Sequence, residues 1–261
     1  MEDTRYTLLD WRNVASRRAG ARIGEPLVYL PEVDSTNTFA ASLLPGATAG
    51  TVVVAEHQTA GRGRLRRPWI APAGSSLTFT VLLAPREVPW AVAMAAGLAV
   101  QDVLHGVGIE ATLKWPNDVL IDGRKCAGIL IESKPVDGAY WLLVGIGLNV
   151  HSADPSIPTA TFLDAHASEP VSREDLLVAL LASLESWLQR AATPHQVREE
   201  WRARLATIGQ MVQVQTPIGP VSGTAEDVAD DGALILRLHD GSRRIVQAGD
   251  VTLAAALPKA E

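Results

Sequence analysis

Four arginines in one short, glycine-containing stretch are the residues of this sequence best suited to chemistry. Residues 61–67 are Gly-Arg-Gly-Arg-Leu-Arg-Arg, with no acidic side chain among them. A guanidinium can hold phosphate through two parallel hydrogen bonds, and glycine lets backbone N–H groups approach an anion closely. The stretch follows residues 51–55, which are typical of a buried strand. We call residues 61–69 the arginine loop and expect it to bind a polyanionic phosphate.

Two well-known phosphate-binding motifs do not fit the arginine loop. No Gly-Lys-Ser/Thr follows it, as a nucleoside-triphosphate P-loop would require. A single Gly-x-Gly is weak evidence for a dinucleotide fold, and no Rossmann-type helix is expected after it. Considered alone, the loop could equally be a solvated basic surface.

Three further stretches place cationic or amide side chains beside apolar segments. Residues 114–118, Lys-Trp-Pro-Asn-Asp, bring a lysine, an amide and a carboxylate into a turn that proline stiffens. Lys125 precedes the small residues 126–128 at the start of an apolar strand, where an unpartnered charge is costly. An anionic ligand would be a suitable partner. Residues 145–149, Gly-Ile-Gly-Leu-Asn, end another strand with an amide.

Patterns of apolar residues predict the elements that position these motifs. We expect helices at 8–19, 37–44, 89–106, 174–190 and 194–205, and strands at 27–30, 51–55, 75–83, 111–114, 119–121, 126–132 and 140–147. Asp34 or Ser35 is available to cap the second helix, and Ser172 to cap the fourth. Asp-Gly turns at 122–123 and 137–138 predict an antiparallel meander instead of repeated βαβ units.

The pattern changes after Gly209 to short strands separated by proline, glycine and Asp-Gly turns. We expect these strands at 211–215, 221–225, 233–238 and 242–248. They predict a small antiparallel barrel of about 50 residues, near the lower size limit for independent stability. Such a barrel would lean on the larger domain.

Composition and charge limit the class of protein. The chain has 261 residues, 47% hydrophobic and 20% charged, which is typical of a globular protein with two domains. A net charge of −6 argues against a general nucleic-acid binder, and the single Cys126 excludes an intramolecular disulfide and fits a reducing compartment. We expect a cytoplasmic protein, because the chain start lacks a secretory pattern and the apolar run at 90–100 is shorter than a membrane span.

Five motifs together resemble those of the biotin protein ligases, in the same order and at compatible spacing over residues 27–250. They are residues 34–37 (Asp-Ser-Thr-Asn), 58–64 (Gln-Thr-Ala-Gly-Arg-Gly-Arg), 114–118, 124–128 (Arg-Lys-Cys-Ala-Gly) and 145–149. The resemblance implies an α+β fold with a mixed, largely antiparallel central sheet flanked by helices, similar to class II aminoacyl-tRNA synthetases. A small C-terminal SH3-like β-barrel would follow. The implied domains are a short N-terminal helical extension (1–26), a catalytic biotin- and ATP-binding domain (27–207) and the barrel (208–261).

The resemblance also implies an activity. A biotin protein ligase joins biotin and ATP into biotinyl-5′-adenylate, releasing pyrophosphate. A lysine of a biotin carboxyl carrier protein or domain then attacks this mixed anhydride and releases AMP. The expected small molecules are therefore biotin, ATP and Mg²⁺, with no tightly bound prosthetic group.

Specific residues of this chain would carry that activity if the resemblance holds. Biotin contacts are expected from Ser35, Thr36, Asn37, Gln58, Arg62, Gly63, Arg64, Lys125 and Gly128. ATP contacts are expected from Arg67, Trp69, Lys114, Asn117, Lys125 and Asn149. The catalytic residues would be Lys125, Arg62, Arg64 and Asp118.

The implied roles differ among these residues. Lys125 would stabilise charge where the biotin carboxylate meets the α-phosphate, while Arg62 and Arg64 would bind the phosphoryl group and close the loop over the adenylate. Trp69 would pack against the adenine. Asp118 would either hold Mg²⁺ or help to deprotonate the acceptor lysine, and the sequence leaves both roles open.

The chain departs from the family pattern in two respects. Leu65-Arg66 replaces the more usual basic-glycine pair, so Arg66 adds bulk and charge to a loop that must fold over the intermediate. Family members that repress transcription carry a DNA-binding domain ahead of the catalytic one, and the short stretch before residue 27 does not match such a domain. We therefore expect a monomer or weak dimer that does not bind DNA.

Two other functions compete with a biotin ligase. A lipoate or octanoate ligase or transferase shares the catalytic fold and also modifies a carrier lysine. Gln58 and the arginine loop favour biotin, because a plain acyl tail needs no hydrogen-bond partners at its far end. A non-catalytic, biotin-responsive regulator is disfavoured by the net charge of −6.

Overall fold

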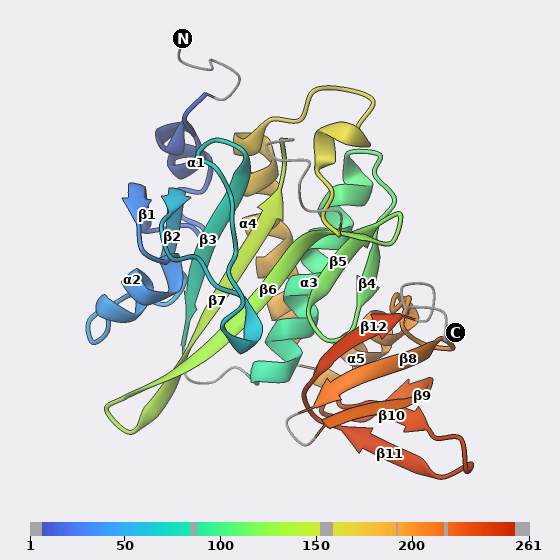
Figure 1. Cartoon of the computed structure of the whole chain (residues 1–261). Coiled ribbons are helices and arrows are strands. Elements are labelled where there is room, and N and C mark those ends of the chain that lie inside the picture. Colours follow the sequence, from blue (N-terminus) through green and yellow to red (C-terminus); the bar gives the residue numbers. More distant parts are fainter. Residues whose placement is uncertain (1–6, 85–87, 152–158, 192, 217–218, 254–261) are drawn as a thin grey trace.

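A seven-stranded sheet forms the centre of the computed structural model, which describes residues 7–84, 88–151, 159–191, 193–216 and 219–253. The strand order is β1-β2-β3-β7-β6-β5-β4 (Figure 1). The strands are β1 (Leu27–Val33), β2 (Val52–Gln58), β3 (Ser76–Leu83), β4 (Thr112–Lys114), β5 (Asp118–Ile121), β6 (Arg124–Val136) and β7 (Ala139–Asn149). β1 and β2 are parallel and the other neighbouring pairs are antiparallel, which confirms the predicted mixed sheet and its meander from β4 to β7.

The sheet separates a layer of helices from the face that carries the predicted motifs. Successive side chains of a strand point to opposite faces. On β3, Leu77 and Phe79 join the main core with α3 (Pro89–Gly106) and α4 (Arg173–Arg190), which pack behind the sheet (Figure 1). Thr80 points to the other face and bonds to α2 (Thr36–Ser42). The arginine loop lies on this second face, which we call the site face (Figure 1).

The helices lie close to the predicted positions. α1 (Trp11–Arg17) and α5 (Pro194–Ala203) complete the set, and among the described residues no helix is long and apolar enough to cross a membrane. The Ser172 side chain caps α4 as predicted, by accepting the N–H of Asp175 at 3.2 Å. The predicted cap of α2 is wrong. Ser35 occupies the N-cap position, but its side chain makes no capping bond, and Asp34 accepts the N–H of Ser35 instead.

The C-terminal part forms a separate five-stranded antiparallel sheet with the order β11-β10-β9-β8-β12. Its strands are β8 (Met211–Thr216), β9 (Gly219–Val228), β10 (Leu234–Arg237), β11 (Arg243–Val246) and β12 (Asp250–Leu253). The sequence predicted the first four strands but not β12. The predicted small antiparallel C-terminal unit is confirmed. Within the described residues no strand pairing joins β11 to β12, so its sheet does not close between these two strands.

Hydrogen bonds hold the smaller sheet against the larger one. Trp115 Nε1 donates to the carbonyl of Gly232 at 2.9 Å, and the N–H of Trp115 donates to Thr207 Oγ1 at 3.0 Å. Trp115 is 1% exposed, so its two donors are paired away from water. These bonds hold the smaller sheet beside β4 and β5 (Figure 1). This agrees with our expectation that the small C-terminal unit packs against the larger domain.

A buried ion pair anchors the start of the chain and α4 to the sheet. Arg173 Nη1 lies 2.7 Å from Glu56 Oε1, and the two side chains are 5% and 2% exposed. Glu56 Oε2 accepts the N–H of Leu9 at 3.1 Å and the hydroxyl of Tyr29 at 3.2 Å. Burial, followed by the charge of Glu56, raises the pKa of Tyr29. Each charge would be uncompensated without the other.

We expect Glu56→Ala to lower the free energy of unfolding by about 3 kcal/mol, because it strands the buried Arg173 charge. Urea denaturation followed by circular dichroism measures this change. The control is Asp230→Asn, which alters a 98% exposed side chain 3.7 Å from Arg198. The control should cost less than about 1 kcal/mol. Equal losses for both variants would contradict the assigned importance of the buried pair.

Candidate active site

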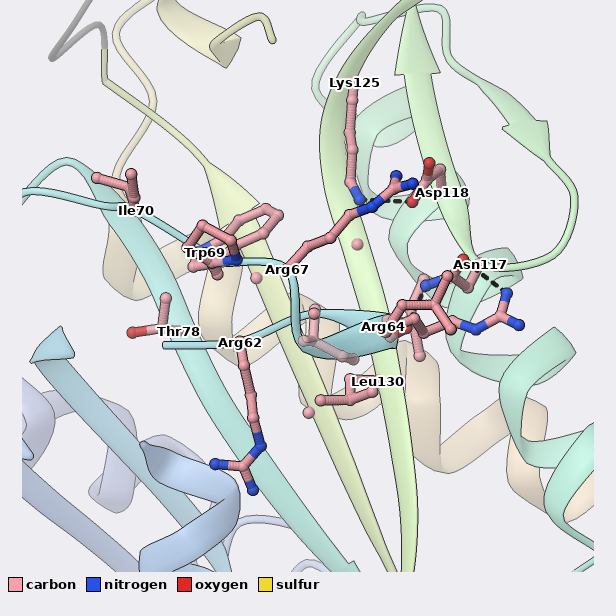
Figure 2. Close-up of a pocket in the computed structure, with 18 of the residues that line it drawn as sticks. Arg62, Arg64, Arg67, Trp69, Ile70, Thr78, Asn117, Asp118, Lys125 and Leu130 are labelled. Carbon is pink, nitrogen blue, oxygen red and sulfur yellow. Dashed lines mark hydrogen bonds and ion pairs between the residues drawn. The ribbon is translucent and has the colours of Figure 1, made fainter. Parts of the chain in front are cut away.

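A cavity of about 320 Å³ lies between the arginine loop and the site face of β3, β6 and β7 (Figure 2). Every predicted site residue except Lys114 lines it. Lys114 contacts a lining residue, because its Nζ lies 3.7 Å from Oδ2 of Asp118. The structure therefore brings the five sequence motifs together at one place, although their contacts with substrates stay predictions.

The arginine loop is a turn with two residues in an unfavourable backbone conformation. An isolated bridge pairs Arg62 with Pro68, and the short helical turn η1 (Arg64–Arg66) lies between them. Leu65 and Arg66 have φ angles of 54° and 58°. Non-glycine residues rarely adopt this left-handed region, whereas glycine does so without steric cost. The Arg66 substitution noted in the sequence thus adds backbone strain to the loop.

Two arginines of the loop contact the second sheet. Arg64 Nη1 donates to the carbonyl of Gly249 at 3.3 Å and to Asn117 Oδ1 at 3.5 Å. Arg67 forms an ion pair with Asp250, the first residue of β12. Burial lowers the pKa of the Arg64 guanidinium, and the nearby Asp118 and Asp250 carboxylates oppose that shift. The wall of the cavity is therefore built from both sheets.

Lys125 has a partner within the protein, in addition to the anionic ligand that the sequence suggested. Its Nζ lies 2.6 Å from Oδ1 of Asp118, and the two side chains are 35% and 12% exposed. Lys125 is the second residue of β6, and Asp118 is the first residue of the neighbouring strand β5 (Figure 2). The same carboxylate lies near Lys114, so two ammonium groups surround one carboxylate at this end of the cavity.

Three glycines let large side chains lie directly on the sheet. A Cβ on Gly147 would fall 2.5 Å from the Trp69 indole, and one on Gly128 would fall 2.9 Å from Lys125 Nζ. Gly128 and Gly147 are opposite each other on β6 and β7. A Cβ on Gly145 would fall 2.6 Å from Asn37 Oδ1. Real Cβ atoms do not approach other atoms so closely, so any larger residue would displace these side chains. The indole over Gly147 is rigid, whereas the end of the Lys125 side chain could move away from Gly128.

The other end of the cavity contains a chain of hydrogen bonds between neutral side chains. Gln58 Oε1 accepts the N–H of Thr36 at 2.8 Å and its hydroxyl at 3.2 Å. Thr80 Oγ1 lies 2.8 Å from Thr36 Oγ1 and 2.6 Å from Asn37 Oδ1. Ser35, beside them, is 3% exposed and its side chain does not cap α2. Buried polar groups of this kind can recognise a polar ligand.

Three other predicted residues also occupy defined places. Asn117 Nδ2 donates to the carbonyl of Ile129 at 2.7 Å, and Asn149 Nδ2 donates to that of Thr161 at 3.2 Å. These bonds fix both amides beside the cavity. Trp69 Nε1 is buried without a hydrogen-bond acceptor among the described residues. A buried unpaired donor is costly, so this N–H suits an acceptor on a ligand.

Sequence reasoning missed several residues of the site. Thr78 and Leu130 line the cavity because they share the site face with the predicted glycines. The period-two alternation of a strand could have identified them. Gly249 and Asp250 also line it, but they come from the second sheet, and no local pattern connects them with the arginine loop. The partners Thr80 and Glu132 lie two residues after Thr78 and Leu130 on the same strands, so the same alternation could have identified them.

Comparisons with known proteins agree with this architecture. Residues 29–149 match the model of the Biotin/lipoate A/B protein ligase family, and residues 207–253 match the Biotin protein ligase C terminal domain. The chain is 39% identical to the Biotin--[acetyl-CoA-carboxylase] ligase of Mycobacterium tuberculosis, covering 93% of this chain and 95% of the relative. It is 32% identical to the Bifunctional ligase/repressor BirA of Bacillus subtilis, over 87% of this chain and 74% of that protein.

A solved structure with the same fold has both substrates of such an enzyme bound. The biotin protein ligase from Aquifex aeolicus in complex with biotin and ATP matches with a TM-score of 0.75 and 27% identity, covering 87% of this chain and 97% of that one. The fold and the two matched models define a ligase of the biotin/lipoate class. Within that class, the chain belongs to the biotin protein ligase family. The resemblance inferred from the five motifs is confirmed.

We predict that Cys126, next to Lys125, is chemically inert in the folded protein. Burial raises the pKa of its thiol to about 12, and the side chain is 0% exposed. At pH 8 the thiolate needed for reaction is therefore scarce and shielded. Reaction with Ellman's reagent should be more than about tenfold slower for the native protein than in urea. Cys126→Ser removes the signal and serves as the control, while equal native and unfolded rates would contradict the prediction.

Proposed function

We propose that this protein activates biotin with ATP and transfers it to a lysine of a biotin carboxyl carrier protein. The observation that carries the proposal is 39% identity, over nearly the whole chain, to a relative named Biotin--[acetyl-CoA-carboxylase] ligase. The geometry supports it, because one cavity combines the cationic arginine loop and Lys125 with an end lined by neutral polar side chains. A charged nucleotide and a small polar head group need these two environments.

In the first half-reaction, a carboxylate oxygen of biotin attacks the α-phosphorus of ATP and pyrophosphate leaves. Lys125, held by Asp118 at 2.6 Å, stabilises the charge where the two substrates meet. A guanidinium has five N–H donors, so the contacts of Arg64 with Asn117 and Gly249 leave donors for phosphate oxygens. Positioning and preorganised charge suffice for this step, and no covalent nucleophile is needed.

In the second half-reaction, the amine of the carrier lysine attacks the carbonyl carbon of the anhydride, and AMP leaves. We assign to Asp118 the orientation of Lys125, because its carboxylate already accepts from that ammonium group. A direct role of Asp118 in taking the proton of the acceptor lysine is the alternative. Loss of only the transfer step in Asp118→Asn would favour the alternative.

The cavity fits a magnesium ion that is bound together with ATP. The described residues contain no cluster of three or more His, Cys, Asp or Glu that could hold a metal alone. Asp118 and Asp250 nevertheless line the cavity. In nucleotide sites Mg²⁺ is usually held by one or two carboxylates together with phosphates and water, so these residues are the suitable ligands. When bound, the ion would neutralise phosphate charge.

The polar end of the cavity favours biotin over lipoate or octanoate. Thr36, Asn37 and Gln58 are held in one hydrogen-bonded chain, and Ser35 is buried beside them. A ureido ring offers donors and a carbonyl acceptor to such groups. An acyl tail would leave them without a ligand partner, which is a large penalty for buried polar groups.

The finer properties are also proposals. The carrier protein partner follows from the family. We propose cytoplasmic location, because the reaction consumes ATP and the single cysteine fits a reducing compartment. We further propose a monomer or weak dimer that does not bind DNA, since a net charge of −6 opposes binding to a polyanion. A biotin-induced gel shift with DNA at physiological salt would disprove the last point.

The activity can be tested by exchange of labelled pyrophosphate into ATP with purified protein. We expect exchange with biotin and none with lipoate or octanoate, because only biotin fits the polar end of the cavity. Addition of a biotin carboxyl carrier domain should then give one biotinylated lysine, seen as a mass increase. Exchange with lipoate or octanoate instead of biotin would show that the protein is a lipoate or octanoate ligase. No exchange with any of the three acids would refute adenylate formation.

We expect Lys125→Ala to reduce biotin-dependent exchange by at least about 100-fold, as loss of a preorganised charge does in other enzymes. The thermal unfolding midpoint should stay near that of the wild type, because Asp118 retains Lys114 as a partner at 3.7 Å. Arg124→Ala is the control, since it removes the exposed neighbouring cation. A Lys125→Ala protein with near wild-type exchange would show that its assigned role is wrong.

A further inference from the structure

Glu132 joins residues that the motifs place in two separate parts of the site. This residue of β6 accepts a hydrogen bond from Asn37 Nδ2 at 2.8 Å. It also accepts bonds from Arg62 Nη2, at 3.1 and 3.3 Å to its two oxygens. Asn37 belongs to α2 and Arg62 to the arginine loop. A single carboxylate therefore connects helix, sheet and loop.

The ion pair with Arg62 is more sheltered than an ordinary surface pair. The side chains of Arg62 and Glu132 are 31% and 25% exposed. Arg62 Nη1 also donates to Thr38 Oγ1 at 2.8 Å, so the guanidinium is held at two edges. Figure 2 shows Arg62 directed away from Arg67 and Lys125. Arg62 is thus bound to the α2 side of the cavity.

The network extends from Glu132 to the polar end of the cavity. Glu132 holds the Asn37 amide by its nitrogen, and Thr80 bonds the Asn37 oxygen at 2.6 Å. Thr80 also meets Thr36, which donates to Gln58. The orientation of the Asn37 amide is therefore fixed at both ends. A disturbance at Glu132 would reach Thr80 and Thr36 through the Asn37 amide, because a turned amide no longer offers its oxygen to the Thr80 hydroxyl.

We propose that Glu132 is a positioning residue that holds the polar end of the cavity and the arginine loop in a fixed position relative to each other. This inference rests on the proposed biotin ligase function. Glu132 acts through Asn37 and Arg62, and its effect falls on biotin more than on ATP. The cations assigned to the nucleotide are held elsewhere, Arg67 by Asp250 and Lys125 by Asp118.

The chemistry of the contacts requires a carboxylate at this position. Both partners of Glu132 are donors, and an ionised carboxylate offers two acceptor oxygens. Glutamine has the same size but offers one acceptor oxygen and one NH₂ group. In Glu132→Gln, an amide oxygen in the place of Oε2 can still accept from both Asn37 and Arg62, but the NH₂ group then takes the place of Oε1, faces Arg62 Nη2 and replaces the charge that pairs with the guanidinium. Aspartate keeps both acceptors on a shorter side chain.

The first test compares kinetic constants of biotin-dependent pyrophosphate exchange in Glu132→Gln and the wild type. We expect the KM for biotin to rise about tenfold, as for loss of one hydrogen bond to a charged group, and the KM for ATP to change less than about twofold. Glu132→Asp should retain part of the biotin affinity. Glu32→Gln is the control, because Glu32 lies on β1 and pairs with His57 at 3.1 Å.

The second test asks whether Glu132 acts through Arg62. In an Arg62→Ala background, the NH₂ group introduced by Glu132→Gln no longer faces a guanidinium, and the amide oxygen can still accept from Asn37. Adding Glu132→Gln to that background should therefore raise the KM for biotin by less than about twofold, against about tenfold in the wild-type background. A purely structural role of Glu132 would instead give the same ratio in both backgrounds.

The outcomes separate this inference from the proposed function. Calorimetry measures biotin binding even in a protein that catalyses no exchange. A wild-type protein without exchange activity would refute the proposed function, and the biotin affinities of the wild type and Glu132→Gln would still test the inference. Equal biotin affinity in Glu132→Gln and wild type would overturn the inference. So would a parallel rise in the KM for biotin and ATP, or an equal ratio in the two Arg62 backgrounds. Thermal unfolding of each variant identifies any loss of fold.

Discussion

Compensation of positive charge is the constraint on which the rest of the site depends. The arginine loop and Lys125 gather cations over one small cavity of a protein whose net charge is −6. Lys125 is paired with Asp118 from β5. Arg62 and Arg67 of the loop are paired with Glu132 from β6 and Asp250 from β12, respectively. Partly buried charges need such partners. Because the acids lie on three strands of two sheets, charge pairing ties the loop to the whole fold.

The same pairing shows where prediction from sequence succeeded and where it failed. Strand and helix periodicity located the central elements, because those patterns are local. The five motifs located more than half of the cavity lining for the same reason. The partner of Lys125 was missed although Asp118 is only seven residues away, because the β5–β6 turn brings the two side chains together and the linear pattern does not show it. The last strand, β12, also depends on long-range pairing, with β8, and was not predicted.

Glycine positions on β6 and β7 carried information that the motif analysis did not use. Gly145 and Gly147 are two residues apart in an apolar strand, so both face the same side of the sheet. A glycine on the exposed face of a central strand weakens it unless something must approach the backbone. Trp69 and Asn37 occupy the space that side chains at these positions would fill. The sequence could therefore predict a close approach here, but not which residues make it.

Strain in the arginine loop links its conformation to its anchors. Leu65 and Arg66 adopt the left-handed region, which costs about 1–2 kcal/mol for each non-glycine residue. That cost is comparable to the net contribution of one or two hydrogen bonds. The loop's own preference therefore does not hold it in place, and its contacts at Arg62 on one side and Arg64 on the other must do so. A ligand that replaces either contact changes the balance, so substrate occupancy and loop position are thermodynamically linked.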